Sequence, residues 1–319
     1  MRSLVAVVLA LAAAAAGAQT YPAPGKPVRI LVGFAPGGGT DIQARIVLPK
    51  LAEALGAPVI VENKPGAGTA LAASEVARSA PDGYTVLYTF NGTFAQLPFT
   101  QHVTYDPFKD FTPISLGARG SQLLVVHSSV PVKNIAELKA YGRANPGKLN
   151  IASFGTGTSS HIFAELLMRQ AGIDMVHVPY KGAGDAAKDL LAGRVQLMFD
   201  AATTAIQNIN TGKLRALGVV APERSKFLPD VPTLTEQGLK GIDLVGWLGW
   251  YGPAGMPKEI VRKINAALVK ALANPEVKAG IEKGAYESIS STPEELAAIT
   301  RESYERWGKI IRDIGIKQQ

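Results

Sequence analysis

The sequence predicts an α/β protein with two lobes, in which mainly parallel sheets lie on either side of a central cleft. Short apolar runs of the length of buried strands alternate with stretches of helical periodicity, a pattern typical of parallel sheets covered by helices. The segments 28–90 and 149–201 also share one order of strands, glycine loops and helices. The chain has 319 residues, which is near the size at which proteins divide into two domains.

Residues 1–18 are expected to be a cleaved secretory signal peptide. Arg2 precedes an apolar segment at 4–16 that is too short to span a membrane, and Ala16-Gly17-Ala18 supplies the small residues of a cleavage site. Export without an anchor predicts a protein of the periplasm. The chain contains no cysteine, which excludes a lipid-attachment cysteine, disulfide bonds and thiolate chemistry.

The charge of the chain is mildly positive and evenly spread. There are 33 Lys and Arg against 26 Asp and Glu, a formal net charge of +7, and the basic residues form no run. Nucleic acid is therefore not expected as a partner. A weak positive field suits the steering of a small anion towards a cleft.

The first lobe is expected to combine residues 19–126 with residues 245–319, so that the C-terminal helices pack back onto it. Pro49 lies inside the first helix, where it removes a backbone hydrogen bond, so we expect a kink or two shorter helices. The last helix begins at the capping box Thr292-Pro293-Glu294-Glu295. The elements predicted here are strands at 28–32, 58–62 and 82–90 and helices at 41–55, 69–79, 257–273 and 293–313.

The second lobe is expected at residues 127–244, including the return of the chain through the hinge. The segment 123–141 reads as a strand, a turn and a short helix, and 242–257 as a strand followed by a turn rich in proline and glycine. The chain is expected to pass between the lobes near 120–128 and 220–250. The remaining elements predicted for this lobe are strands at 149–153, 175–179 and 193–201 and helices at 162–171 and 185–192.

Two glycine loops, GFAPGGGTD (33–41) and FGTGTSSH (154–161), each follow a strand and precede a helix. The first departs from the phosphate-loop pattern of nucleotide-binding proteins because Gly39 replaces the lysine. Ligands of such sheets bind at helix N-termini, where free N–H groups and the helix dipole favour an anion. A carboxylate suits this site better than a triphosphate. The alternative is that the glycines serve only to make tight left-handed turns.

No arrangement of residues points to catalysis, a metal or a cofactor. The four histidines lack metal-ligand spacing, and the segment 157–161 departs from the nucleophile elbow of hydrolases at its last position. Ser159 or Ser160 beside His161 would suggest a hydrolase of small esters, which is the alternative hypothesis. Adjacent residues at a helix start point in different directions, which argues against it. Asp200, at the end of an apolar strand, either faces the cleft or caps the next segment.

A series of motifs, in order over almost the whole chain, resembles the Bug-type periplasmic solute-binding receptors of tripartite tricarboxylate transporters. The resemblance implies a type II-like periplasmic-binding-protein fold that closes around a small mono-, di- or tricarboxylate, as a monomer that works with the membrane subunits of the transporter. A receptor that passes the ligand signal to a membrane sensor is the second reading. The motifs are VGFAPGGGTD, VIVENKPGAG, APDGYTVL, ANPGKLNIASFGTGTSSH, MVHVPYKGAG, VQLMFD, GKLRALGV, LPDVPTLTEQGL and GPAGMPKEIVRKIN.

The resemblance also implies ligand-binding residues. One departure is the stretch TFNGTFAQLP (89–98), in which Phe94 replaces the usual histidine and Phe90 adds a second ring near Thr93. This departure favours a ligand with an apolar or aromatic body. The candidate residues are Phe34, Gly38, Gly39, Thr40 and Asp41 from the first loop, Phe90, Thr93 and Phe94 from this stretch, Thr156, Thr158, Ser159, Ser160 and His161 from the second loop, and Tyr180 and Asp200 at the border of the pocket.

Overall fold

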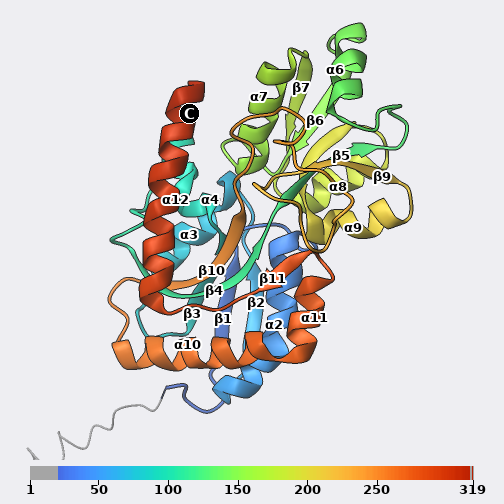
Figure 1. Cartoon of the computed structure of the whole chain (residues 1–319). Coiled ribbons are helices and arrows are strands. Elements are labelled where there is room, and N and C mark those ends of the chain that lie inside the picture. Colours follow the sequence, from blue (N-terminus) through green and yellow to red (C-terminus); the bar gives the residue numbers. More distant parts are fainter. Residues whose placement is uncertain (1–20, 317, 319) are drawn as a thin grey trace, which may run out of the picture.

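The computed structural model describes residues 21–316 and 318, which form two lobes, each built on one mixed sheet (Figure 1). The predicted α/β fold with two lobes is therefore confirmed. The predicted signal peptide, residues 1–18, lies outside the described residues. Within the described part of the chain, no helix combines the length and the apolar character needed to cross a membrane.

The sheet of the first lobe has six strands in the order β11-β4-β10-β3-β1-β2. Strand β1 pairs in parallel with β2 and β3, whereas the pairings of β10 with β3 and of β4 with β10 and β11 are antiparallel. The bounds are β1 (Val28–Val32), β2 (Val59–Asn63), β3 (Thr85–Phe90), β4 (Phe111–Gly120), β10 (Gly246–Pro253) and β11 (Tyr286–Ser288).

The sheet of the second lobe has five strands in the order β7-β6-β8-β5-β9. Here β6 pairs in parallel with β7 and β8, and β5 pairs antiparallel with β8 and β9. The expectation of mainly parallel sheets thus holds only for the repeated half of each lobe. The bounds are β5 (Gln122–His127), β6 (Leu149–Ser153), β7 (Met175–Pro179), β8 (Leu197–Ala201) and β9 (Leu214–Val219).

The first crossing between the lobes takes a single residue. Strand β4 ends at Gly120 in the first sheet, and β5 begins at Gln122 in the second, so the chain crosses at Ser121. The predicted boundary at residue 126 therefore moves to Ser121, because the whole apolar strand β5 is needed to join β8 to β9. The chain returns between β9 and β10.

Helices cover both sheets, and the last helix contacts both lobes. Helix α10 (Lys258–Ala273) packs on α2 (Gly39–Leu55) and β4, and α11 (Pro275–Glu282) packs on α2 and β11. Helix α12 (Pro293–Ile314) packs on β4 and α4 (Gly92–Ala95) (Figure 1). The end of α12 reaches the second lobe as well, because Trp307 packs on Phe163 of α7 with ring centroids 5.4 Å apart. Packing of the C-terminal helices on the first lobe alone is therefore too narrow a prediction.

Two local predictions about helices have different outcomes. Thr292 and Glu295 form the capping box predicted for α12. Pro49 does not divide α2, which is one continuous helix from Gly39 to Leu55. The hydrogen bond that Pro49 removes would have ended on the carbonyl of Arg45, whose side chain is exposed, so water can take its place. Packing on α10 and α11 then holds the helix in one piece.

The helix bounds complete the description. In the first lobe they are α2 (Gly39–Leu55), the 3₁₀ turn η1 (Ala67–Thr69), α3 (Ala70–Ala77), α4 (Gly92–Ala95), α5 (Leu97–Thr100), α10 (Lys258–Ala273), α11 (Pro275–Glu282) and α12 (Pro293–Ile314). In the second lobe they are α6 (Ile135–Ala144), α7 (Ser159–Ala171), α8 (Ala183–Leu191) and α9 (Ala202–Asn210).

Candidate functional site

The two glycine loops end in the same backbone conformation. The residue before α2, Gly38, has φ −76° and ψ 163°, and the residue before α7, Thr158, has φ −77° and ψ 164°. The preceding residues, Gly37 and Gly157, have φ of 81° and 79°, a left-handed conformation that requires glycine. The similarity between the repeated segments is thus a match of geometry, and each loop presents the N-terminus of a helix to the space between the lobes.

In both loops, the side chain of the third helical residue holds the glycine two places before the helix. The N–H of Gly37 donates to Oδ2 of Asp41 at 2.9 Å, and the N–H of Gly157 donates to Nδ1 of His161 at 3.1 Å. Asp41 and His161 are therefore supports of the loops. Neither lines the cavities described below.

The negative charge of Asp41 is offset by its ion pair with Arg45. Burial alone would raise the pKa of the Asp41 carboxyl, but hydrogen bonds from Arg45, the Gly37 N–H and Asn63 outweigh burial and lower it. Asn63 also donates to the carbonyl of Phe34 at 3.0 Å. The first loop is therefore fixed by an ionised aspartate that is already paired with a cation.

The second loop is held by neutral histidines instead. His161 and His177 stack with ring centroids 4.2 Å apart, and His177 Nε2 lies 2.6 Å from the hydroxyl of Ser153, which accepts from the Gly155 N–H. Burial lowers the pKa of both histidines, that of His177 to about 4. Because Nδ1 of His161 accepts a hydrogen bond, it carries no proton in this arrangement.

The hydroxyl groups of the second loop show no arrangement for nucleophilic catalysis. Ser160 Oγ accepts from the N–H of Phe154 at 2.9 Å, and Ser159 Oγ accepts from Nε2 of Gln122 at 2.8 Å. Among the described residues, neither serine hydroxyl is hydrogen-bonded to His161 or Asp200. The geometry that would support the hydrolase alternative is therefore not found in the described chain.

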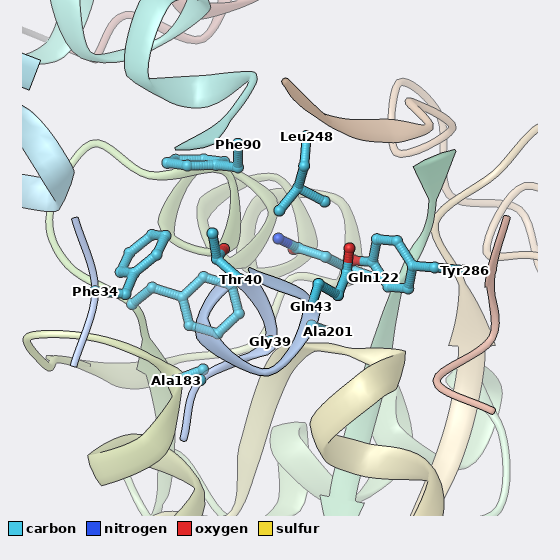
Figure 2. Close-up of a pocket in the computed structure, with 12 residues that line it drawn as sticks. Phe34, Gly39, Thr40, Gln43, Phe90, Gln122, Ala183, Ala201, Leu248 and Tyr286 are labelled. Atoms are coloured by element: carbon cyan, nitrogen blue, oxygen red, sulfur yellow. The ribbon is translucent and has the colours of Figure 1, made fainter. Parts of the chain in front are cut away.

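A cavity lies beside the N-terminus of α2, between the lobes (Figure 2). It encloses about 470 Å³ of space, part of it open to solvent, and its walls are mostly apolar. Figure 2 shows Phe34 and Phe90 on one side and Gln122, Gln43 and Tyr286 reaching in from the other. The lining residues are Phe34, Gly38, Gly39, Thr40, Gln43, Phe90, Gln122, Phe154, Ala183, Ala201, Leu248 and Tyr286.

A second cavity of about 400 Å³ adjoins the first, beside the N-terminus of α7. Phe90, Gln122, Leu248 and Tyr286 line both cavities. The second is also lined by Asn91, Gly120, Ser159, Phe163, Leu244, Gly246, Trp247 and Trp307. No lysine or arginine is among the residues that line either cavity, and the described residues contain no cluster of His, Asp and Glu that could hold a metal.

Some of the predicted site residues line a cavity, and the others do not. Phe34, Gly38, Gly39, Thr40 and Phe90 line the first cavity, and Phe90 and Ser159 line the second. The others that the sequence suggested line neither cavity: Asp41, Thr93, Phe94, Thr156, Thr158, Ser160, His161, Tyr180 and Asp200.

Phe94 does not face the cleft, which corrects the interpretation of the 89–98 stretch. Its side chain is fully buried, and its ring packs on Tyr251 and Phe111 with centroids 4.6 Å and 4.7 Å away. The Thr93 hydroxyl is likewise internal, 2.6 Å from that of Thr89. Of the three candidate residues in this stretch, Phe90 alone lines a cavity; Asn91, which was not a candidate, lines the second.

Asp200 is buried beneath the cleft at the end of β8. Its Oδ1 accepts from the Thr204 hydroxyl at 2.6 Å, while Oδ2 has no hydrogen-bond partner among the described residues. Burial raises the pKa of Asp200 to about 7. Burial also raises the pKa of nearby Tyr286, and the charge of Asp200 adds to that rise. Asp200 therefore does not line the cavities but affects the titration of Tyr286, which does.

Most of the lining residues that sequence reasoning missed come from outside the glycine loops. Gln122 begins β5, Leu248 lies in β10, and Tyr286 begins the three-residue strand β11. A polar residue directly before the apolar run 123–126 is a weak signal for Gln122. Leu248 and Tyr286 have no distinguishing signal. Also missed were Gln43, Ala183 and Ala201 of the first cavity and Phe154 of the second glycine loop. The second cavity adds Asn91, Gly120, Phe163, Leu244, Gly246, Trp247 and Trp307.

Comparison with known proteins defines the class of this chain. The sequence model of the protein family described as tripartite tricarboxylate transporter family receptor matches residues 43–316 of this chain. The chain belongs to this family of receptors, as the motifs had indicated.

Solved structures with the same fold cover nearly the whole chain. The periplasmic binding protein BugD is 34% identical and superposes with a TM-score of 0.90, covering 94% of this chain and 100% of its own. MatC from Rhodopseudomonas palustris, solved with malate, is 34% identical with a TM-score of 0.86, covering 91% and 100%. Rpa4515 from R. palustris, solved with adipate, is 30% identical with a TM-score of 0.89, covering 94% and 100%.

Proposed function

We propose that this protein is a periplasmic receptor that closes over a small carboxylate and presents it to the membrane subunits of a tripartite tricarboxylate transporter. The observation that carries the proposal is the pair of matched helix N-termini facing cavities with no basic residue in their walls. The similarity to receptors solved with malate and adipate supports a carboxylate as the ligand.

The first cavity supplies both parts of a carboxylate site. The N–H groups of the first helical turn have no acceptor within a helix, so those at the start of α2 are available to a carboxylate, together with the Thr40 hydroxyl. Phe34, Phe90 and Leu248 supply an apolar surface for the body of the ligand. Gly38 and Gly39 allow the anion to approach the backbone closely.

Closure of the lobes brings the two halves of the site together. Gln43 Nε2 of the first lobe lies 3.4 Å from the Thr203 hydroxyl of the second, and Thr100 donates to the carbonyl of Gly157 at 3.3 Å. Such contacts form only when the lobes meet, so a ligand that bridges them shifts the receptor towards this closed form. Cleavage of the signal peptide after Ala18 and a monomeric receptor are parts of the same proposal.

The proposal is tested by thermal unfolding of residues 19–319 with a set of acids and their neutral amides. Succinate, malate, adipate and benzoate are compared with succinamide, adipamide and benzamide. A ligand at 100 times its Kd stabilises the folded state by about 2.7 kcal/mol, so at least one acid should raise the melting temperature while its amide does not. If no acid raises it, or acid and amide raise it equally, the carboxylate proposal is wrong.

A further inference from the structure

The two cavities share four lining residues, and one of them has a polar, flexible side chain. Three of their four shared residues, Phe90, Leu248 and Tyr286, are large rings or apolar groups packed in the first lobe. The fourth, Gln122, enters from β5 and lines both cavities. Figure 2 shows its side chain reaching into the first cavity. Its backbone is fixed, since the Gln122 carbonyl accepts from Val220 N–H at 2.9 Å. The Gln122 side chain can therefore move while its backbone stays in place.

The hydrogen bonds of Gln122 make that movement easy. Its Nε2 donates to Ser159 at 2.8 Å, but its Oε1 is buried and has no partner among the described residues. Rotation of the side chain therefore breaks one hydrogen bond and releases an amide oxygen from an unfavourable position. A ligand too long for the first cavity can displace this side chain at little cost.

The second cavity has the features needed for the far end of such a ligand. Asn91 and Ser159 supply polar side chains, and Ser159 is also the first residue of α7, the counterpart of Gly39 in α2. Trp247, Phe163 and Trp307 supply aromatic walls for methylene groups. An acid group at each end of a linear chain would then meet one of the two matched helix N-termini.

We propose that Gln122 sets the length of the ligand, and that displacement of its side chain joins the two cavities into one site for linear dicarboxylates. This inference rests on the proposed carboxylate function and names the ligand class for it. Truncation of Gln122 should therefore favour long dicarboxylates over short ones.

The test measures Kd by calorimetry for the dicarboxylates from succinate to suberate, with hexanoate as the one-ended partner of adipate. In Gln122→Ala, the ratio of the Kd for succinate to that for suberate should rise at least tenfold. Gln122→Met, which keeps the length of the side chain, should leave this ratio within about twofold of the wild type. Gln43→Ala is the matched control, because Gln43 lines only the first cavity.

Ser159→Ala tests the far end of the ligand. It should weaken adipate at least fivefold while changing hexanoate less than twofold, because hexanoate has no second acid group. Equal ratios in Gln122→Ala and Gln43→Ala, or equal losses of adipate and hexanoate in Ser159→Ala, would overturn the inference even if acids bind. Absence of binding by every acid to the wild type would instead overturn the proposed function.

Discussion

Replacement of Asp200 by asparagine should remove a pH dependence of stability that this buried carboxyl imposes. Asp200 is 1% exposed, and burial raises its pKa from 3.8 to about 7, with only the Thr204 hydroxyl and a backbone N–H opposing the rise. The folded state therefore keeps the proton of Asp200 between pH 3.8 and 7, while the unfolded state has lost it. Because the folded state binds more protons in this range, stability falls as the pH rises.

The size of the effect follows from the same pKa. Raising it from 3.8 to about 7 corresponds to about 4 kcal/mol lost by the folded state above pH 7. Asparagine has no charge to lose, but its amide N–H₂ would lie at the unpartnered Oδ2 position, which costs about 1–3 kcal/mol at every pH. Asp200→Asn should therefore be less stable than the wild type at pH 4 and equally or more stable at pH 8.5.

Urea unfolding between pH 4 and 8.5 measures both free energies of unfolding. Asp185→Asn is the matched control, because the Asp185 side chain is 52% exposed and its pair with Lys188 is screened by solvent. The difference between Asp200→Asn and the wild type should change by about 4 kcal/mol across the range, and that for the control by less than about 1 kcal/mol. Parallel curves for Asp200→Asn and the wild type would refute the reasoning.

Three further predictions concern the loops and the charges around them. A Cβ atom at Gly39 would lie 3.1 Å from Cβ of Ala201 across the cleft. Gly39→Val should therefore hinder closure of the lobes and weaken carboxylate binding by about 1–3 kcal/mol in calorimetry. Unchanged affinity would contradict closure of the lobes around the ligand. In the same calorimetry, Thr40→Val should weaken carboxylate binding by about 1–3 kcal/mol, because Thr40 lines the first cavity. Lys181→Ala should weaken it by less than about 1 kcal/mol, because Lys181 is exposed; the reverse order would indicate that a salt bridge holds the ligand. The pKa of His177, about 4 in the folded state, makes stability rise with pH between 4 and 6.5, where the unfolded state binds more protons. His177→Gln, made in the Asp200→Asn background, should flatten this rise in urea unfolding. An unaltered rise would contradict a neutral His177.

The parts of the fold that depend on local signals could be predicted from the sequence. Strand β1 with its glycine loop and α2, and strand β6 with its loop and α7, lie within a few residues of the predicted ranges. Each is marked by an apolar run followed by glycines at positions with left-handed φ. These patterns involve only residues that are close together in the chain, so they can be recognised in a single sequence.

The walls of the cleft depend on contacts between distant segments, which one sequence does not specify. Tyr286 reaches the cavities only because β11 pairs with the edge of β4, and Gln122 does so because the chain crosses between the sheets at Ser121. Phe94 and Phe90 illustrate the same limit. Both are phenylalanines of one short stretch, yet Phe94 joins the aromatic core while Phe90 lines both cavities.

The difference between the two matched loops bears on how an anion is held. Asp41 and His161 occupy equivalent positions and both accept the N–H of the glycine two places before the helix, so that N–H is not available to a ligand. A charged Asp41 would repel a carboxylate, but its pairing with Arg45 and Asn63 offsets this repulsion, and neutral His161 adds none. What remains for the ligand is the first turn of each helix and the hydroxyl groups beside it. Recognition then depends on oriented dipoles and not on a salt bridge, which is consistent with cavities lined by no lysine or arginine.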